Sequence, residues 1–130
     1  MIDHLTLLVS DYERAKTFYL QALGPLGYEL VMELTRDQIP GLPFEKGCGL
    51  GFEGKPDLWI RSGTDIVPTH VAFRAHSPDA VRAFYEAAIA AGAKDNGPPG
   101  LREQYHPSYY GAFVLDPDGY NIEAVCHDAE

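Results

Sequence analysis

An internal repeat is the feature that most constrains the fold of this chain. Residues 3–19 ("DHLTLLVSDYERAKTFY") align without a gap with residues 69–85 ("THVAFRAHSPDAVRAFY") at an offset of 66 residues. The coinciding pairs include His4 with His70, Phe18 with Phe84 and Tyr19 with Tyr85. A repeat at this period indicates two copies of one supersecondary unit. We expect a single domain with one module at about residues 1–64 and a second at about 65–130.

Each copy predicts the element order β-α-β-β-β. An alternating strand leads into a helix with an apolar stripe at i, i+3 and i+4, and short strands punctuated by glycine follow. Ser10 with Glu13 predicts the start of the first helix, and Ser77 before Pro78 predicts the start of the second. The later strands are expected at 28–34, 47–53 and 56–62 in the first copy, and at 109–116 and 120–127 in the second.

The two units should share one hydrophobic core, because each is too small to bury its own sheet face. The predicted fold class is α+β. Two pseudo-symmetric β-α-β-β-β modules would form a curved mixed sheet around a cleft, with the helices outside. The segment 35–47 has two prolines and no periodicity, and we expect a loop there that lies over the cleft.

The charge balance argues against nucleic acid or an anionic membrane surface as a partner. Ten basic and 19 acidic side chains give a formal charge of -9, which repels phosphate groups. There is no apolar run of the roughly 20 residues that span a bilayer, and the start of the chain does not resemble a signal peptide. We therefore expect a cytoplasmic protein in which Cys48 and Cys126 are buried thiols.

Three strands each offer one potential metal ligand. Alternation places His4 and His70 on the strand face opposite the plainly apolar one, and Glu123 stands between Ile122 and Ala124 in an apolar strand. Two imidazoles and a carboxylate form the donor set of a facial triad on a divalent metal. The alternatives are histidines with purely structural roles and a glutamate that faces water.

The doubled module, the histidine in each first strand and the "DPDGYNIE" ending (116–123) resemble the vicinal oxygen chelate superfamily over essentially the whole chain. This superfamily includes glyoxalase I, extradiol dioxygenases, fosfomycin-resistance enzymes and bleomycin-resistance proteins. The resemblance implies a divalent metal (Fe, Mn, Ni or Zn) held by His4, His70 and Glu123. It also implies a small-molecule substrate that chelates the metal through adjacent oxygen atoms, and a homodimer.

The sequence departs from two members of that superfamily. Glyoxalase I-like enzymes carry a fourth ligand, a glutamate, near a position where this chain has Leu58 or Trp59. Asp57 is one or two residues out of register, and a shift of two would keep it on the face of Trp59. Extradiol dioxygenases carry a further histidine between the two ligand histidines, which residues 5–69 lack, and a tyrosine near the position of Phe113.

Several other residues are candidates for catalysis or substrate binding. Tyr109 and Tyr110 should point to opposite faces of their strand, so that one of them can donate a proton or a hydrogen bond in the cleft. His106 is a further candidate for acid-base chemistry, and Arg74 shares the face of His70 and could hold an anionic group. Aromatic residues would line the substrate site: Phe44, Phe52, Trp59 and Phe113.

Two functional hypotheses follow. The leading one is a metal-dependent enzyme, either a glyoxalase-type lyase or isomerase or an extradiol-type dioxygenase. The other is a metal-free protein of the bleomycin-resistance type that sequesters a ligand. The complete set of two histidines and one glutamate favours the enzyme, because a pure binding protein does not need it.

Overall fold

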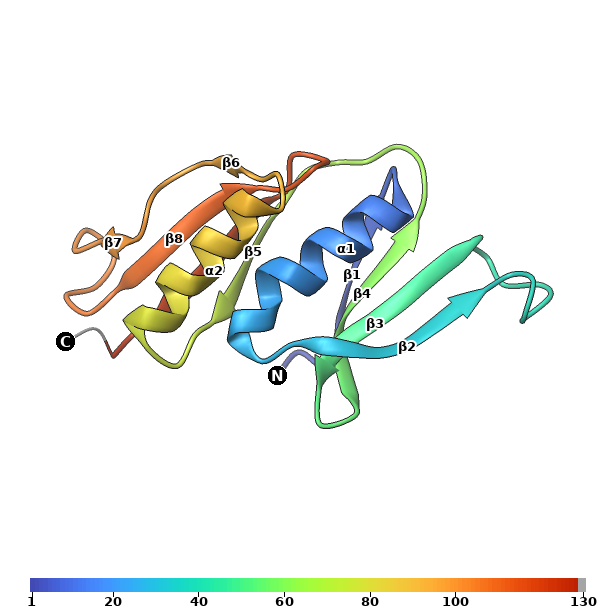
Figure 1. The fold of residues 1–130 in the computed structure, drawn as a ribbon, viewed down its shortest axis with the longest axis horizontal. Helices are drawn as coiled ribbons and strands as arrows, with labels where there is room; N and C mark the ends of the chain where they lie inside the picture. Colours follow the sequence, from blue (N-terminus) through green and yellow to red (C-terminus); the bar gives the residue numbers. More distant parts are fainter. Residues whose placement is uncertain (129–130) are drawn as a thin grey trace.

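The computed structural model describes residues 1–128, in which two modules follow one another along the chain (Figure 1). The first module consists of β1 (Leu5–Val9), α1 (Tyr12–Leu23), the 3₁₀ turn η1 (Gly24–Leu26), β2 (Glu29–Thr35), β3 (Lys46–Phe52) and β4 (Lys55–Ser62). The second module consists of β5 (His70–Arg74), α2 (Pro78–Ala90), β6 (Lys94–Asp95), β7 (Gly100–Leu101), β8 (Tyr110–Leu115) and β9 (Asn121–Cys126).

The two modules build their sheets in the same way. The strand order is β1-β4-β3-β2 in the first sheet and β5-β9-β8-β6 in the second, and β7 also pairs with β8. In each sheet the first strand runs parallel to the last strand of its module, and the neighbouring pairs are antiparallel. The predicted α+β fold with two repeated modules is confirmed.

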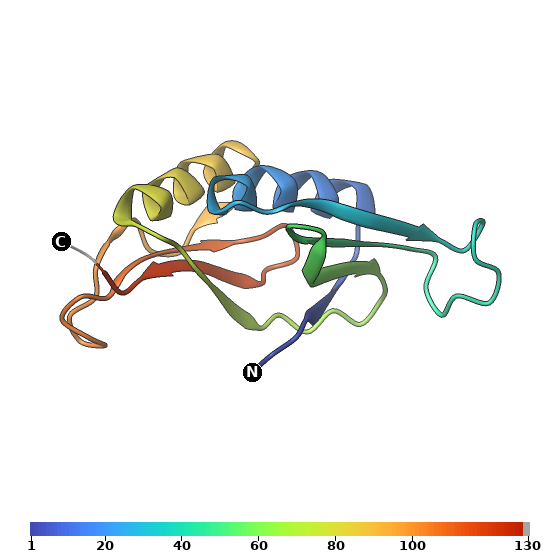
Figure 2. The same cartoon turned by 90° about the horizontal axis from the view of Figure 1, so that it is seen from below.

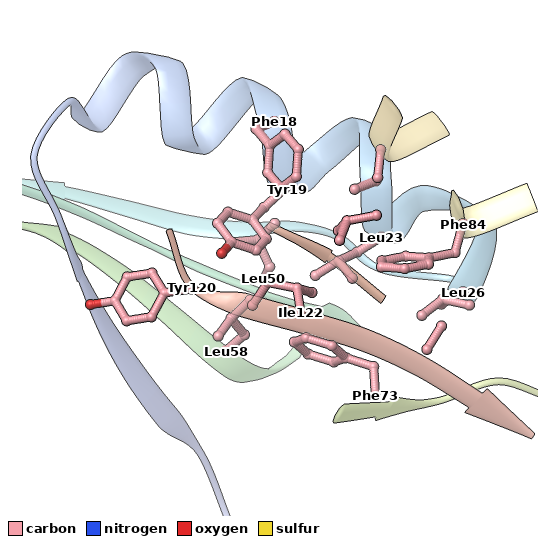
Figure 3. Close-up of a cluster of buried hydrophobic side chains, with 14 of the residues drawn as sticks. Phe18, Tyr19, Leu23, Leu26, Leu50, Leu58, Phe73, Phe84, Tyr120 and Ile122 are labelled. Atoms are coloured by element: carbon pink, nitrogen blue, oxygen red, sulfur yellow. The ribbon is translucent and has the colours of Figure 1, made fainter. Parts of the chain in front are cut away.

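Both helices lie side by side on the same side of the two sheets, as Figure 2 shows. Their apolar stripes meet the inward residues of the strands in one continuous core, part of which is drawn in Figure 3. Phe18 and Tyr19 of α1 and Phe84 of α2 are fully buried, as the repeat predicts. Cys48 and Cys126 are buried free thiols. No helix within residues 1–128 is long and apolar enough to cross a membrane.

The structure differs from the predicted elements in two places. The N-cap of α1 is Asp11, whose side chain accepts from the N–H of Arg14, and not Ser10. Ser77 does cap α2, with Pro78 in the first turn. The second strand of the second module is reduced to β6 and β7, two residues each, because the two prolines of the "DNGPPG" segment lack the N–H needed for a strand ladder.

The turn between β8 and β9 joins the two modules. The buried carboxylate of Asp116 accepts hydrogen bonds from the hydroxyl of Tyr19 in α1 and from the backbone N–H groups of Asp118 and Tyr120. Ser10 donates its hydroxyl and its backbone N–H to Asp118. The hydroxyl of Tyr120 donates to the backbone oxygen of Leu8 over 2.7 Å. Burial raises the pKa of Asp116, and the hydrogen bonds that it accepts from Tyr19, Tyr120 and Asp118 oppose that rise.

Replacement of Asp116 by alanine should destabilise the fold strongly. The change leaves the buried Tyr19 hydroxyl without its acceptor and frees two backbone donors, so we expect the free energy of unfolding to fall by about 3 kcal/mol. Urea denaturation followed by circular dichroism measures this. Asp118→Ala, in the same turn but only half-buried, is the matched control and should cost about 1 kcal/mol or less. Equal losses in the two variants would contradict a special role for Asp116.

Candidate functional site

The side chains with potential chemistry gather on the sheet faces that the helices leave uncovered. We call these the open faces of the first and the second sheet. The core residues of β5 and β9 contact the helix side, so alternation turns His70 and Glu123 to the open face of the second sheet. By the same rule Thr6, Trp59 and Arg61 lie on the open face of the first sheet.

Glu123 is a buried carboxylate with two partners. Its side chain is only 1% exposed, and its Oε1 lies 2.8 Å from Nε2 of His70. Its Oε2 accepts a hydrogen bond from the hydroxyl of Tyr109. A Cβ atom at Gly111 would lie 3.2 Å from Cε1 of Tyr109 and 3.3 Å from Oε2 of Glu123, so the glycine leaves the space in which these two side chains meet. Desolvation and the bond to Glu123 raise the pKa of Tyr109, which keeps its phenol a proton donor.

The geometry of His70 and Glu123 fits two ligands of one metal ion. An ion with bonds of about 2.1 Å to nitrogen and oxygen holds two ligand atoms at a right angle about 3 Å apart. The observed separation of Nε2 and Oε1 is 2.8 Å. The side chain of His70 is 51% exposed, so an ion or a ligand could reach this pair from solvent.

His4 lies apart from this pair within the chain. It precedes β1 in the first sheet, its Nδ1 lies 2.7 Å from Oδ1 of Asp3, and its side chain is 53% exposed. It lines a cavity together with Trp59 and Arg61. Nowhere in residues 1–128 do three His, Cys, Asp or Glu side chains come close enough to hold one metal ion. Of the predicted set of His4, His70 and Glu123, only the two residues of the second module, His70 and Glu123, lie together.

The strand register shows what the first module has in place of Glu123. Ala72 pairs with Glu123 in the second sheet, and Thr6, its counterpart in the repeat, pairs with Trp59 in the first. Asp57 does not replace the missing carboxylate. Leu50 pairs with Leu58 and Gly51 with Pro56, so a bulge leaves Asp57 without an opposite residue, and its Oδ2 accepts from the hydroxyl of Tyr28 over 3.0 Å. Asp57, whose alternative interpretation is a strand-edge aspartate in water, lines a different cavity from Trp59.

A family model described as the Glyoxalase/Bleomycin resistance protein/Dioxygenase superfamily matches residues 1–124 of the sequence. The chain belongs to this superfamily. The match confirms the resemblance that the repeat and the final strand indicate. A search of curated proteins by sequence found no match.

Solved structures of the superfamily have the same fold. A glyoxalase/bleomycin resistance protein from Albidiferax ferrireducens is 27% identical, with a TM-score of 0.74 over 95% of this chain and 96% of that one. Glyoxalase I from Zea mays is 22% identical, with a TM-score of 0.70 over 99% of this chain and 45% of that one. A mutant of the fosfomycin resistance protein FosX from Listeria monocytogenes, complexed with Mn(II) and 1S,2S-dihydroxypropylphosphonic acid, is 19% identical, with a TM-score of 0.66 over 96% of this chain and 88% of that one.

The structure distinguishes among the candidate acid-base residues of this superfamily member. Tyr109 contacts Glu123, whereas Tyr110 lies on the opposite face, where its hydroxyl accepts from Nη1 of Arg82 over 2.8 Å. The two tyrosines thus point to opposite faces, as alternation predicts. His106 lies in the loop before β8, and its Nδ1 accepts from the N–H of Ser108 over 3.0 Å.

The predicted substrate-binding residues are distributed over three places. Phe113 pairs with Glu123 in the register of β8 and β9, and its ring centroid lies 6.2 Å from that of His70. Trp59 lines the cavity of His4, and Arg74 lines a different cavity of about 300 Å³. Sequence reasoning missed Arg102, whose guanidinium lies 5.3 Å from the ring centroid of Phe113. No sequence pattern points to it, because the segment before β8 has no period.

The two adjacent tyrosines provide a matched test of this site. Tyr109→Phe removes the donor to Oε2 of the buried Glu123, so we expect the free energy of unfolding at pH 7 to fall by about 1–3 kcal/mol. Tyr110→Phe removes an exposed bond to Arg82 and should cost less than about 0.5 kcal/mol. Urea denaturation of both variants measures the difference. If Tyr109→Phe unfolds at the wild-type midpoint, the hydrogen bond to Glu123 does not stabilise the fold.

Proposed function

We propose that this superfamily member is a metal-dependent enzyme that acts on a small substrate with adjacent oxygen atoms. The single observation that carries the proposal is the pair of His70 and the buried Glu123, held at the spacing of two metal ligands. The FosX relative, complexed with Mn(II) and a dihydroxy compound, supports the same chemistry for this fold. A divalent ion bound at this pair would act as a Lewis acid toward the substrate oxygens.

We further propose that the third ligand is His4 of a second copy of the chain. His4 does not join His70 and Glu123 within one chain, so a complete triad requires another source of an imidazole. Apolar residues around the first strand favour a second copy as that source, because Ile2 and Val67 are strongly exposed and Leu5 is partly exposed. In the part of the chain that the structure describes, β1 and β5 are also unpaired sheet edges.

Each side chain near the pair then has a distinct role. Glu123 and His70 bind the ion, and the hydroxyl of Tyr109 orients the carboxylate by donating to Oε2. The same hydroxyl is placed to donate a hydrogen bond or a proton to negative charge that develops on a substrate oxygen. The ring of Phe113 lies beside His70 and would contact an apolar part of the substrate. This set favours proton-transfer chemistry of the lyase or isomerase type.

Metal content provides the first test. We expect protein purified without an affinity tag, or reconstituted with Mn, Fe, Ni or Zn, to hold about one ion per chain by elemental analysis. Glu123→Gln and His4→Ala should each reduce this amount at least tenfold. Mutation of a residue that only hydrogen-bonds to a ligand typically lowers metal affinity ten- to a hundredfold, and loss of a ligand itself should lower it further. His76→Ala, an exposed histidine in a bend, is the matched control and should bind like wild type. A wild type that cannot be loaded would favour the metal-free sequestering protein instead.

A mixing experiment tests the origin of the third ligand. Neither His4→Ala nor Glu123→Gln alone forms a complete site in a homodimer. After the two variants are unfolded and refolded together, about half of the dimers are mixed, and each mixed dimer has one intact site of two. We therefore expect about a quarter of the wild-type metal capacity to return. No recovery would contradict a site shared between copies.

Oxygen uptake separates the two reaction types. With Fe(II)-loaded protein and catechols as probes, we expect no oxygen consumption above that of the Glu123→Gln variant, because the proposed lyase or isomerase reaction does not use dioxygen. Uptake that depends on both the catechol and Glu123 would show a dioxygenase instead.

A further inference from the structure

The open face of the first sheet contains a cavity near three glycines of β3. Gly47, Gly49 and Gly51 alternate along β3, so all three lie on one face of the strand. Gly47 pairs with Arg61, and Gly49 pairs with Trp59. The bare backbone at Gly47 and Gly49 leaves space that side chains from neighbouring segments fill.

Two aromatic rings lie against these glycines and form part of the cavity wall. A Cβ atom at Gly47 would lie 2.7 Å from Cε2 of Phe44, and one at Gly49 would lie 3.1 Å from Cη2 and Cζ2 of Trp59. Phe44 comes from the loop between β2 and β3. The cavity has a volume of about 230 Å³ and is lined by His4, Thr6, Leu34, Phe44, Trp59 and Arg61.

Arg61 lacks an anionic partner in this cavity. Its guanidinium lies 5.3 Å from the ring centroid of Phe44, and its buried Nε has no hydrogen-bond partner within residues 1–128. Within residues 1–128, four of the ten basic residues form ion pairs with carboxylates, and Arg61 is among the six that do not. Arg61 is half-buried, and it is the buried and unpaired Nε that calls for an explanation.

We infer that this cavity binds a single-ring aromatic carboxylate, with the ring between Phe44 and Trp59 and the carboxylate on Arg61. A guanidinium binds a carboxylate through two parallel hydrogen bonds, which would give Arg61 the anionic partner that it lacks. The volume lies below the range of about 300–1,000 Å³ for drug-sized ligands, which favours one ring. The cavity is also lined by His4, so the identification of this ligand as the substrate rests on the proposed function. The binding of the carboxylate to Arg61 does not depend on the proposed function.

Trp59 allows a direct binding test, because it is the one tryptophan of the sequence. Benzoate is titrated into wild-type protein treated with EDTA, and tryptophan fluorescence is recorded. We expect a saturable change with benzoate. Benzamide has the same ring without the charge and should bind roughly tenfold to a hundredfold more weakly. Acetate should produce no saturable change, because it lacks the ring.

Variants assign the charge to one residue. Arg61→Gln should weaken benzoate binding roughly tenfold to a hundredfold. Arg14→Gln, an exposed arginine on α1, is the matched control and should bind like wild type. Arg61→Lys retains the charge without the planar fork and should bind with intermediate affinity, provided that its circular dichroism spectrum and urea midpoint match those of wild type. This variant keeps the test valid if Arg61→Gln does not fold.

Three results would overturn the inference: no saturable response to benzoate, equal binding of benzamide and benzoate, or unchanged binding in well-folded Arg61→Gln and Arg61→Lys. The metal-free condition separates this test from that of the proposed function. Benzoate binding to a protein that cannot be loaded with metal would support the cavity while refuting the enzyme. Metal loading without benzoate binding would do the reverse.

Discussion

The buried carboxylate of Asp116 is the interaction on which the rest of the structure depends. It accepts the hydroxyl of Tyr19 from the first helix and two backbone N–H groups of its own turn. One side chain thus fixes the shape of the turn and attaches it to the other module. A buried carboxylate without such donors would cost several kcal/mol, a large fraction of the stability of a domain of this size. The two modules therefore fold as one unit, although their sheets are separate.

This constraint extends to the candidate site through the last strand. Tyr120 is anchored to Leu8, and β9 begins at the next residue. Ile122 and Ala124 are fully buried on the core side, so a shift of one residue would put both on the open face and Glu123 in the core. The position of the carboxylate is consequently determined by core packing and by the turn. His70 and Tyr109 then complete its hydrogen bonds from the two neighbouring strands.

The sequence predicts what depends on local pattern and misses what depends on contacts between distant segments. The repeat and the alternation predict the fold class, the shared face of His70 and Glu123 and the opposite directions of the two tyrosines. Ser10 is a plausible helix cap by its local sequence, but its hydroxyl is bonded to Asp118, 108 residues away, and Asp11 caps the helix. The bulge at Asp57 and the separation of His4 from Glu123 arise in the same way, from strand pairing and sheet placement that no local pattern encodes.

The two modules have kept one fold while their open faces have come to differ. At equivalent positions of the strand register, the second sheet has Glu123 and the first has Trp59. A metal site that combined both faces would therefore have three protein ligands and an aromatic wall where a second carboxylate could stand. Fewer protein ligands leave more positions on the ion for substrate oxygens. The glycines fit this division, because Gly47 and Gly49 in β3 leave room for the rings of Phe44 and Trp59, whereas Gly111 in β8 leaves room for the contact between Tyr109 and Glu123.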